Sequence, residues 1–214
     1  MGGNTMPDQA VKPALRAALR FNEIGSRTPY EISFAQKANS GGSFGFMQGD
    51  LAAGQPIAHS TFRRCMAAAG MPPATIDDFE RRLSGKGIPP TVISAAEKQQ
   101  IDAALAANNA LVDAMDEDIL SKVYGGLDRC LQAAQAANRS IAPIAQLYIA
   151  MWVNMTGPPD KILDFLRGPN LGDTVGEADI QTYLQASKYF RENPRNFQHM
   201  VDSASAGAAE LPED

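Results

Sequence analysis

The sequence has very few of the residues that build metal centres and disulfide frameworks. It contains two cysteines, Cys65 and Cys130, and two histidines, His59 and His199, and none belongs to a CxxC, HxxxH or HExxH pattern. We therefore expect no metal site and no cofactor, and we predict two buried thiols on helices. The acidic segment "DAMDEDIL", residues 113–120, lacks the glycine and spacing of an EF-hand loop, so calcium binding is not expected.

Long hydrophobic runs and an excess of basic residues are also missing. No apolar stretch reaches the ~18 residues of a membrane span, and the longest, "IAPIAQLYIAMWV", is interrupted by Pro143 and Gln146. The N-terminus has no basic region followed by an apolar one, as a Sec signal peptide would. The formal net charge of −5 argues against nucleic acid as the main partner. We expect synthesis in the cytoplasm without a Sec signal, no membrane insertion, and a non-Sec route if the protein reaches the periplasm or cell wall.

Helical periodicity is what the sequence has in abundance. The 214 residues, 44% of them hydrophobic and 20% charged, are typical of an ordinary globular protein. We predict a mainly α (α+β) fold, with a single domain over residues 1–203 and a flexible tail over 204–214. Glycines at positions 25, 70 and 157 are placed to end helices, Ser94 and Glu97 form a capping box, and Gly125-Gly126 mark a weak point in a long helical segment.

A short region near the N-terminus departs from the helical pattern. In "YEISFA", residues 30–35, large apolar side chains alternate with smaller or polar ones, which is typical of a strand. "QKANSGG" has the composition of a turn, and "SFGFM", residues 43–47, can form the returning strand. The following "QGDLAAGQP" is predicted to be a loop. The sequence therefore predicts a small β-hairpin, with Glu31 on its first strand.

Glu23 is predicted to lie in the last turn of the first helix, just before Gly25. The carbonyl end of a helix dipole repels a carboxylate and favours the protonated acid. An acidic residue at this end is therefore a hint of function.

The segment "SFGFMQGD", residues 43–50, is similar to the "FGLMQVD"-type segment of goose-type lysozymes and to the "GLMQ" of lytic transglycosylases. Its first five residues also resemble the "TIGYG" strand of phage-type lysozymes. A helix ending in glutamate, a small hairpin and then a helical bundle is the order of elements in the lysozyme-like superfamily. The resemblance covers roughly residues 10–60. It implies a lysozyme-like helical domain with a small β-hairpin lobe.

The resemblance also implies an enzyme that cleaves β-1,4 bonds in peptidoglycan, a muramidase, by general acid catalysis. Two glutamates compete for the role of the acid. Glu31 precedes Gln48 by a spacing close to that of lytic transglycosylases, whereas Glu23 matches the helix-end position of goose-type and phage-type enzymes, with Tyr30 downstream as in the phage-type pattern. Because Glu31 falls in an alternating segment, we favour Glu23.

Other residues take roles by the same resemblance. Asp50, Ser43 or Glu31 would assist the attacking water, each with a plain structural role as the competing interpretation. Tyr30, Gln48 and Phe46 would bind the sugar. The phage-type pattern has an aspartate where this sequence has Ile32, so both retention and inversion stay open.

Three interpretations of function remain. The favoured one is a peptidoglycan hydrolase of the endolysin or injected-effector kind, acting on peptidoglycan or a related amino-sugar polymer. A lytic transglycosylase or a chitosanase-like glycosidase on the same scaffold is the second. The third is a non-catalytic glycan-binding or structural protein, because a fold alone does not establish an activity. The oligomeric state is not predicted.

Overall fold

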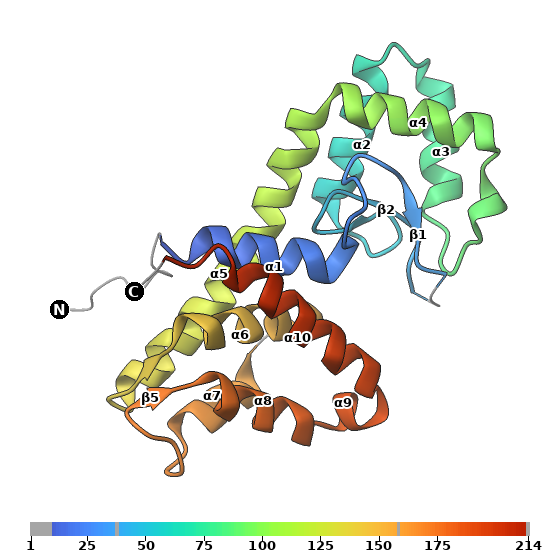
Figure 1. The fold of residues 1–214 in the computed structure, drawn as a ribbon. Helices are drawn as coiled ribbons and strands as arrows, with labels where there is room; N and C mark the ends of the chain where they lie inside the picture. Colours follow the sequence, from blue (N-terminus) through green and yellow to red (C-terminus); the bar gives the residue numbers. More distant parts are fainter. Residues whose placement is uncertain (1–9, 37–38, 158, 213–214) are drawn as a thin grey trace. The chain divides into compact units, whose positions relative to one another are not determined.

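The computed structural model describes residues 10–36, 39–157 and 159–212, and the chain forms two compact units (Figure 1). The first unit comprises Met1–Gly25 together with Ser121–Asp214, and the second unit is Ser26–Leu120. The described residues are mainly helical, with one small antiparallel sheet and one small parallel sheet. The predicted mainly α (α+β) class is therefore confirmed.

The first unit is built around a buried helix, α6. Its elements are α1 (Lys12–Ile24), β4 (Ser140–Ile141), α6 (Pro143–Thr156), α7 (Asp160–Arg167), β5 (Thr174–Val175), α8 (Glu177–Ala186), α9 (Lys188–Glu192) and α10 (Pro194–Ala208). Every residue of α6 from Ala145 to Val153 is buried, as its apolar sequence requires. The strands β4 and β5 pair in parallel, a contact that the sequence did not predict.

The first and last helices of this unit, α1 and α10, lie side by side (Figure 1). A Cβ atom added at Gly207 would lie 2.6 Å from the carbonyl oxygen of Ala14 and 2.7 Å from Cβ of Ala18. Only glycine allows the two backbones to approach so closely. The helix continues to Ala208, with Ala204 buried, so the predicted tail boundary at residue 204 lies too early. Residues 213–214 of that tail lie outside the described residues.

The second unit places a three-stranded sheet against helices. Its elements are β1 (Ser33–Phe34), β2 (Gly42–Phe44), β3 (Gly49–Asp50), α2 (Pro56–Ala68), α3 (Pro73–Leu83), the 3₁₀ turn η1 (Pro90–Val92), α4 (Ala95–Ala107) and the first part of α5 (Asn109–Ala136). Phe44 of β2 and Phe62 of α2 pack in its core, with ring centroids 6.2 Å apart. The end of α5, from Ser121, belongs to the first unit.

The sheet confirms the predicted hairpin and extends it. The antiparallel order is β1-β2-β3, with Ser33 opposite Ser43 and Ser43 opposite Asp50. The third strand lies in the segment that was predicted to be a loop. Glu31 is not on a strand, contrary to prediction, because the N–H of Ile32 donates to Oδ1 of Asp102 at 2.8 Å and pairing starts only at Ser33. Residues 37–38 of the predicted turn lie outside the described residues.

Local signals in the sequence mark the helix ends correctly. Helix α1 ends at Gly25, α2 ends shortly before Gly70, and α6 ends at Gly157, and all three glycines have positive φ. The capping box of Ser94 and Glu97 is present at the start of α4. These predictions are confirmed. The sequence alone was sufficient for them because each helix end depends on neighbouring residues.

The predicted weak point at Gly125-Gly126 does not interrupt the helix, since α5 is continuous from Asn109 to Ala136. A Cβ atom at Gly126 would lie 2.5 Å from Cγ1 of Val153 on α6. The glycine is therefore required for close helix packing and not for a break.

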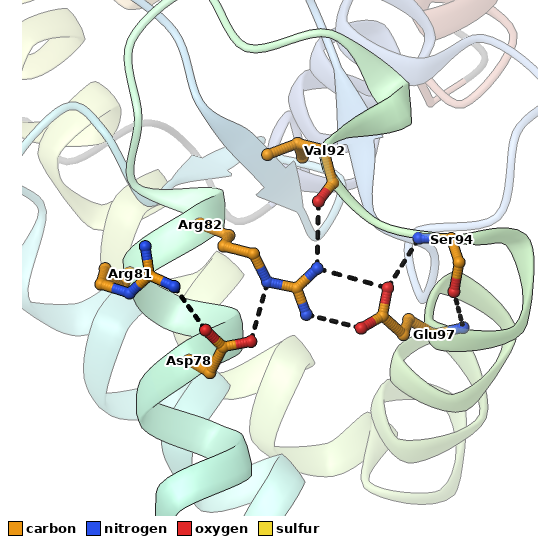
Figure 2. A network of polar contacts seen from close by, with 6 residues as sticks. All are labelled: Asp78, Arg81, Arg82, Val92, Ser94 and Glu97. Atoms are coloured by element: carbon orange, nitrogen blue, oxygen red, sulfur yellow. Dashed lines mark hydrogen bonds and ion pairs between the residues drawn. The ribbon is translucent and has the colours of Figure 1, made fainter.

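A polar network joins α3 to the start of α4 (Figure 2). The guanidinium of Arg82 donates to Oε1 of Glu97 at 2.6 Å and to the carbonyl of Val92 at 3.0 Å, and its Nε lies 2.9 Å from Oδ2 of Asp78. Glu97 also accepts the backbone N–H of Ser94 at 2.7 Å. One carboxylate therefore caps α4 and ties it to α3.

The structure also bears on the two cysteines, on membrane-spanning helices and on groups that could bind a metal ion. Cys65 and Cys130 are both free and buried, as predicted. Within the described ranges, no helix combines the length and the apolar character needed to cross a membrane. In the same ranges, no group of three or more histidine, cysteine or acidic side chains is arranged to hold a metal ion.

Candidate functional site

Glu23 lies in the last turn of α1 and is partly buried. Its Oε1 accepts a hydrogen bond from Nδ2 of Asn22 at 3.0 Å and another from Nδ2 of Asn154 at 2.9 Å. The last turn of α1 carries no basic residue. The helix terminus therefore presents a carboxyl group that two neutral amides orient.

The contact with Asn154 is a product of the fold, because 131 positions separate the two residues. Asn154 comes from the last turn of α6, a helix that is mostly apolar. Both amides donate to the same oxygen, Oε1 of the Glu23 carboxyl group. Tertiary packing therefore contributes to the orientation of this carboxyl group.

Ser43 and Gln48 come together at the sheet, with Ser33 as a third member. The hydroxyls of Ser33 and Ser43 both donate to Oε1 of Gln48 at 3.0 Å, and the two hydroxyl oxygens are 3.1 Å apart. Nε2 of Gln48 donates to the carbonyl of Gly45 at 3.0 Å. Gln48 has a φ of 51°, a conformation that L-residues rarely adopt, and these three contacts hold it there.

The turn before Gln48 is held by Asp116 of α5. The buried carboxylate accepts the backbone N–H groups of Phe46 at 2.9 Å and Met47 at 3.0 Å. Gly45 has a φ of 80°, and a Cβ atom there would collide with Oδ1 of Asp116. A glycine is needed at this point both for the turn and for the approach of the carboxylate.

The Asp50 carboxylate accepts hydrogen bonds from the loop residues on both sides of the sheet strands. Its Oδ1 accepts the backbone N–H groups of Gly41 at 3.0 Å and Ala52 at 2.7 Å, and its Oδ2 accepts the hydroxyl of Ser40 at 2.5 Å. Three donors to one carboxylate are typical of a residue that organises a loop.

The remaining predicted residues differ in exposure. Phe46 is only 2% exposed, and Ser43 only 3%. Tyr30 is partly buried, and its hydroxyl donates to Oδ1 of Asp113 at 3.0 Å. Glu31 is exposed and, with Tyr30, lines a pocket of the second unit. The structure therefore groups Ser43 with Gln48 and Tyr30 with Glu31 inside that unit, while Glu23 belongs to the first unit.

Two polar residues of these environments, Asp116 and Asn154, were missed from the sequence. Asp116 stands in an acidic run, which is usually a solvated face, yet Val112, Met115 and Leu120 around it form a buried helical stripe. An aspartate on the buried face of a helix could therefore have been identified as a residue with a structural role. Asn154 gave a weaker signal, because it is a single amide near the end of a mostly apolar helix.

No family model, curated protein or solved structure matches the chain.

Proposed function

We propose that this protein is a glycoside hydrolase that cleaves β-1,4 bonds in peptidoglycan, with Glu23 as the general acid. The observation that carries the proposal is the geometry of Glu23 itself. The carboxyl group sits at the carbonyl end of α1, partly buried, and is oriented by amides from two different helices. The helix dipole at that end disfavours the carboxylate and so favours the form that can donate a proton.

In the proposed reaction, the carboxyl group of Glu23 donates its proton to the glycosidic oxygen as the C–O bond to the anomeric carbon breaks. Water then adds to the anomeric carbon and returns a proton to the carboxylate. The lysozyme-like pattern of residues 10–60 supports peptidoglycan as the substrate. No cofactor takes part in this scheme.

The test is digestion of purified peptidoglycan by the wild type, Glu23→Gln, Glu31→Gln and Asp164→Asn, with soluble products identified by mass. General acids contribute about 10²- to 10⁴-fold in rate, so Glu23→Gln should lose that much. Glutamine keeps an oxygen for the two asparagine amides, so the variant should fold normally. Asp164 is exposed on α7, and its replacement controls for the loss of one negative charge.

The products separate the proposal from its rivals. Reducing-end muropeptides that depend on Glu23 support a muramidase, and anhydro products identify a lytic transglycosylase. Loss of cleavage only in Glu31→Gln would assign the acid to Glu31 instead. Release from chitosan but not from peptidoglycan would indicate a chitosanase-like enzyme. If the wild type cleaves neither polymer, the proposal is wrong and a glycan-binding or structural role takes its place.

A further inference from the structure

A pocket of about 420 Å³ lies in the second unit, between α4 and the segment that leads into β1. Its volume falls within the range of small-molecule sites, about 300–1,000 Å³. Thr28, Tyr30 and Glu31 line one side of it. The other lining residues all come from α4, namely Ala95, Lys98, Gln99, Asp102, Ala103 and Ala106.

These α4 residues recur every three or four positions, so they share one face of the helix. The face runs from position 95 to position 106, which corresponds to about 16 Å along a helix axis at about 1.5 Å per residue. The three alanines leave room along it, and Ala95, Ala103 and Ala106 are all exposed. The shape is that of an open groove with short apolar side chains, which suits an extended ligand with an aliphatic part.

The charge of the groove comes from one unpaired carboxylate. Lys98 and Asp102 neutralise each other through a contact of 2.5 Å, and Asp102 also accepts the N–H of Ile32. Glu31 has no hydrogen bond or ion pair to any other described residue. A single exposed carboxylate beside apolar side chains matches a single ammonium group carried on an aliphatic stem.

We infer that this groove binds the peptide stem of peptidoglycan, with the free amino group of its diamino acid beside Glu31. The inference rests on the proposed function for its choice of polymer, and it gives Glu31 a part in binding and not in bond cleavage. Amide groups of the peptide would find Gln99 and Thr28, and the aliphatic stem would lie on the alanines. A deacetylated glycan fits less well, because it carries an amine on every sugar and the groove offers one unpaired carboxylate.

Calorimetric titration of the purified full chain tests the inference. The probes are a synthetic stem tripeptide ending in lysine, the same peptide with its ε-amino group acetylated, and a glucosamine trimer. We expect the lysine peptide to bind about fivefold more tightly than the acetylated one, an effect at the upper end of what one exposed ion pair contributes. Glu31→Gln should abolish that difference, and raised salt should reduce it.

Two pairs of variants separate binding in the groove from general effects: Ala103→Leu with its control Ala96→Leu, and Glu31→Gln with its control Asp164→Asn. Ala103→Leu should weaken the lysine peptide by at least the same factor, whereas Ala96→Leu, on the same helix but away from the groove, should not. Asp164→Asn, which removes a negative charge from the other unit, should leave binding unchanged.

The outcomes for binding and for cleavage are independent. Tight binding of the lysine peptide by a protein that cleaves no glycan would leave the groove assignment standing and overturn the proposed hydrolase. Cleavage without binding of any probe would overturn the groove assignment alone. A glucosamine trimer that binds more tightly than the peptide, in a manner that depends on Glu31, would show that the occupant is a glycan and contradict the inference.

Discussion

At the scale of single residues, Asp116 is a buried carboxylate that holds a turn of the second unit. Its buried carboxylate satisfies two backbone N–H groups of the turn that leads to Gln48. Removing an acceptor leaves a buried donor without a partner, which costs more than the hydrogen bond contributes. The bonds to Asp116 act together with the contacts of Gln48 to Ser33, Ser43 and Gly45, which also hold the turn.

We therefore predict that Asp116→Ala lowers the free energy of unfolding by about 2–5 kcal/mol, because two donors lose their acceptor. Asp116→Asn keeps one acceptor oxygen and should cost about half as much. Urea unfolding followed by circular dichroism measures both. Asp164→Asn serves as an exposed control and should change stability by less than about 0.5 kcal/mol. Equal stability of wild type and Asp116→Ala would contradict this account of the turn.

At the scale of elements, the network of Arg82, Glu97 and Ser94 fixes how α3 and α4 meet (Figure 2). The hydrogen bond from Arg82, and then those from Ser94, lower the pKa of Glu97 from 4.5 to about 2. A carboxyl group with a lowered pKa in the folded state stabilises the fold above its unfolded pKa. That stabilisation is lost as the pH falls through the folded value.

The stability difference between the wild type and Glu97→Gln should therefore depend on pH. It should be constant above about pH 5 and shrink as the pH falls from 4.5 towards 2, because the wild-type carboxyl then becomes neutral like the amide. Urea midpoints measured at steps of pH give the result. A difference that stays the same over this range would show that Arg82 does not interact with the charge of Glu97.

The pair Gly125-Gly126 on α5 gives a second prediction at this scale. Gly125 is exposed and a Cβ atom there meets nothing within 4 Å, whereas at Gly126 it would lie 2.5 Å from Val153. Gly125→Ala should stabilise the protein by about 0.5–1 kcal/mol through helix propensity. Gly126→Ala should destabilise it by about 1–3 kcal/mol through overpacking. Thermal unfolding of the two variants would contradict this packing if both shifted in the same direction.

The features that were predicted correctly depend on residues close together in the sequence, whereas the features that were missed depend on contacts between distant residues. The end of α1 at Gly25 and the cap of α4 depend on adjacent residues and were predicted correctly. The strand β3 consists of two residues, and its pairing with β2 depends on the sheet register, which has no signal in so short a segment. Gly126 was misjudged because its packing partner is on another helix.

In the candidate site, too, local features were predicted correctly and long-range contacts were missed. The position of Glu23 at a helix end was predicted from local signals, but Asn154 reaches it from 131 positions away. Glu31 was expected on a strand, and the bond from Ile32 to Asp102, which lies 70 positions further on, keeps it off the sheet. Contacts of this range are set by tertiary packing and leave little trace in a single sequence.

At the scale of the whole molecule, each unit contains one buried thiol. Cys65 is in the second unit and Cys130 in the first. Burial raises the pKa of Cys65 to about 11 and that of Cys130 to about 12. The thiolate is the reactive form, so both side chains should be inert in the folded protein.

We predict that a thiol-specific chromogenic reagent modifies neither cysteine at pH 8 and modifies both in concentrated urea. Variants with a single cysteine, Cys65→Ala and Cys130→Ala, then report the opening of one unit each. Absorbance with time gives the rate, and the small change in side-chain volume keeps the fold intact. Stoichiometric modification of either cysteine within minutes under native conditions would contradict the burial of that thiol.

The second unit interrupts the first along the chain, and this order has a consequence for synthesis on the ribosome. Helix α1 packs against α10, the last helix of the described residues, while residues 26–120 form a compact unit of their own. Domains fold as they emerge, from the N-terminus onward. The second unit can therefore fold before α10 is synthesised, whereas α1 has to wait for α10 before the two helices can pack. The hydrogen bond from Asn154 to the proposed acid, Glu23, would likewise form only after the second unit has been synthesised.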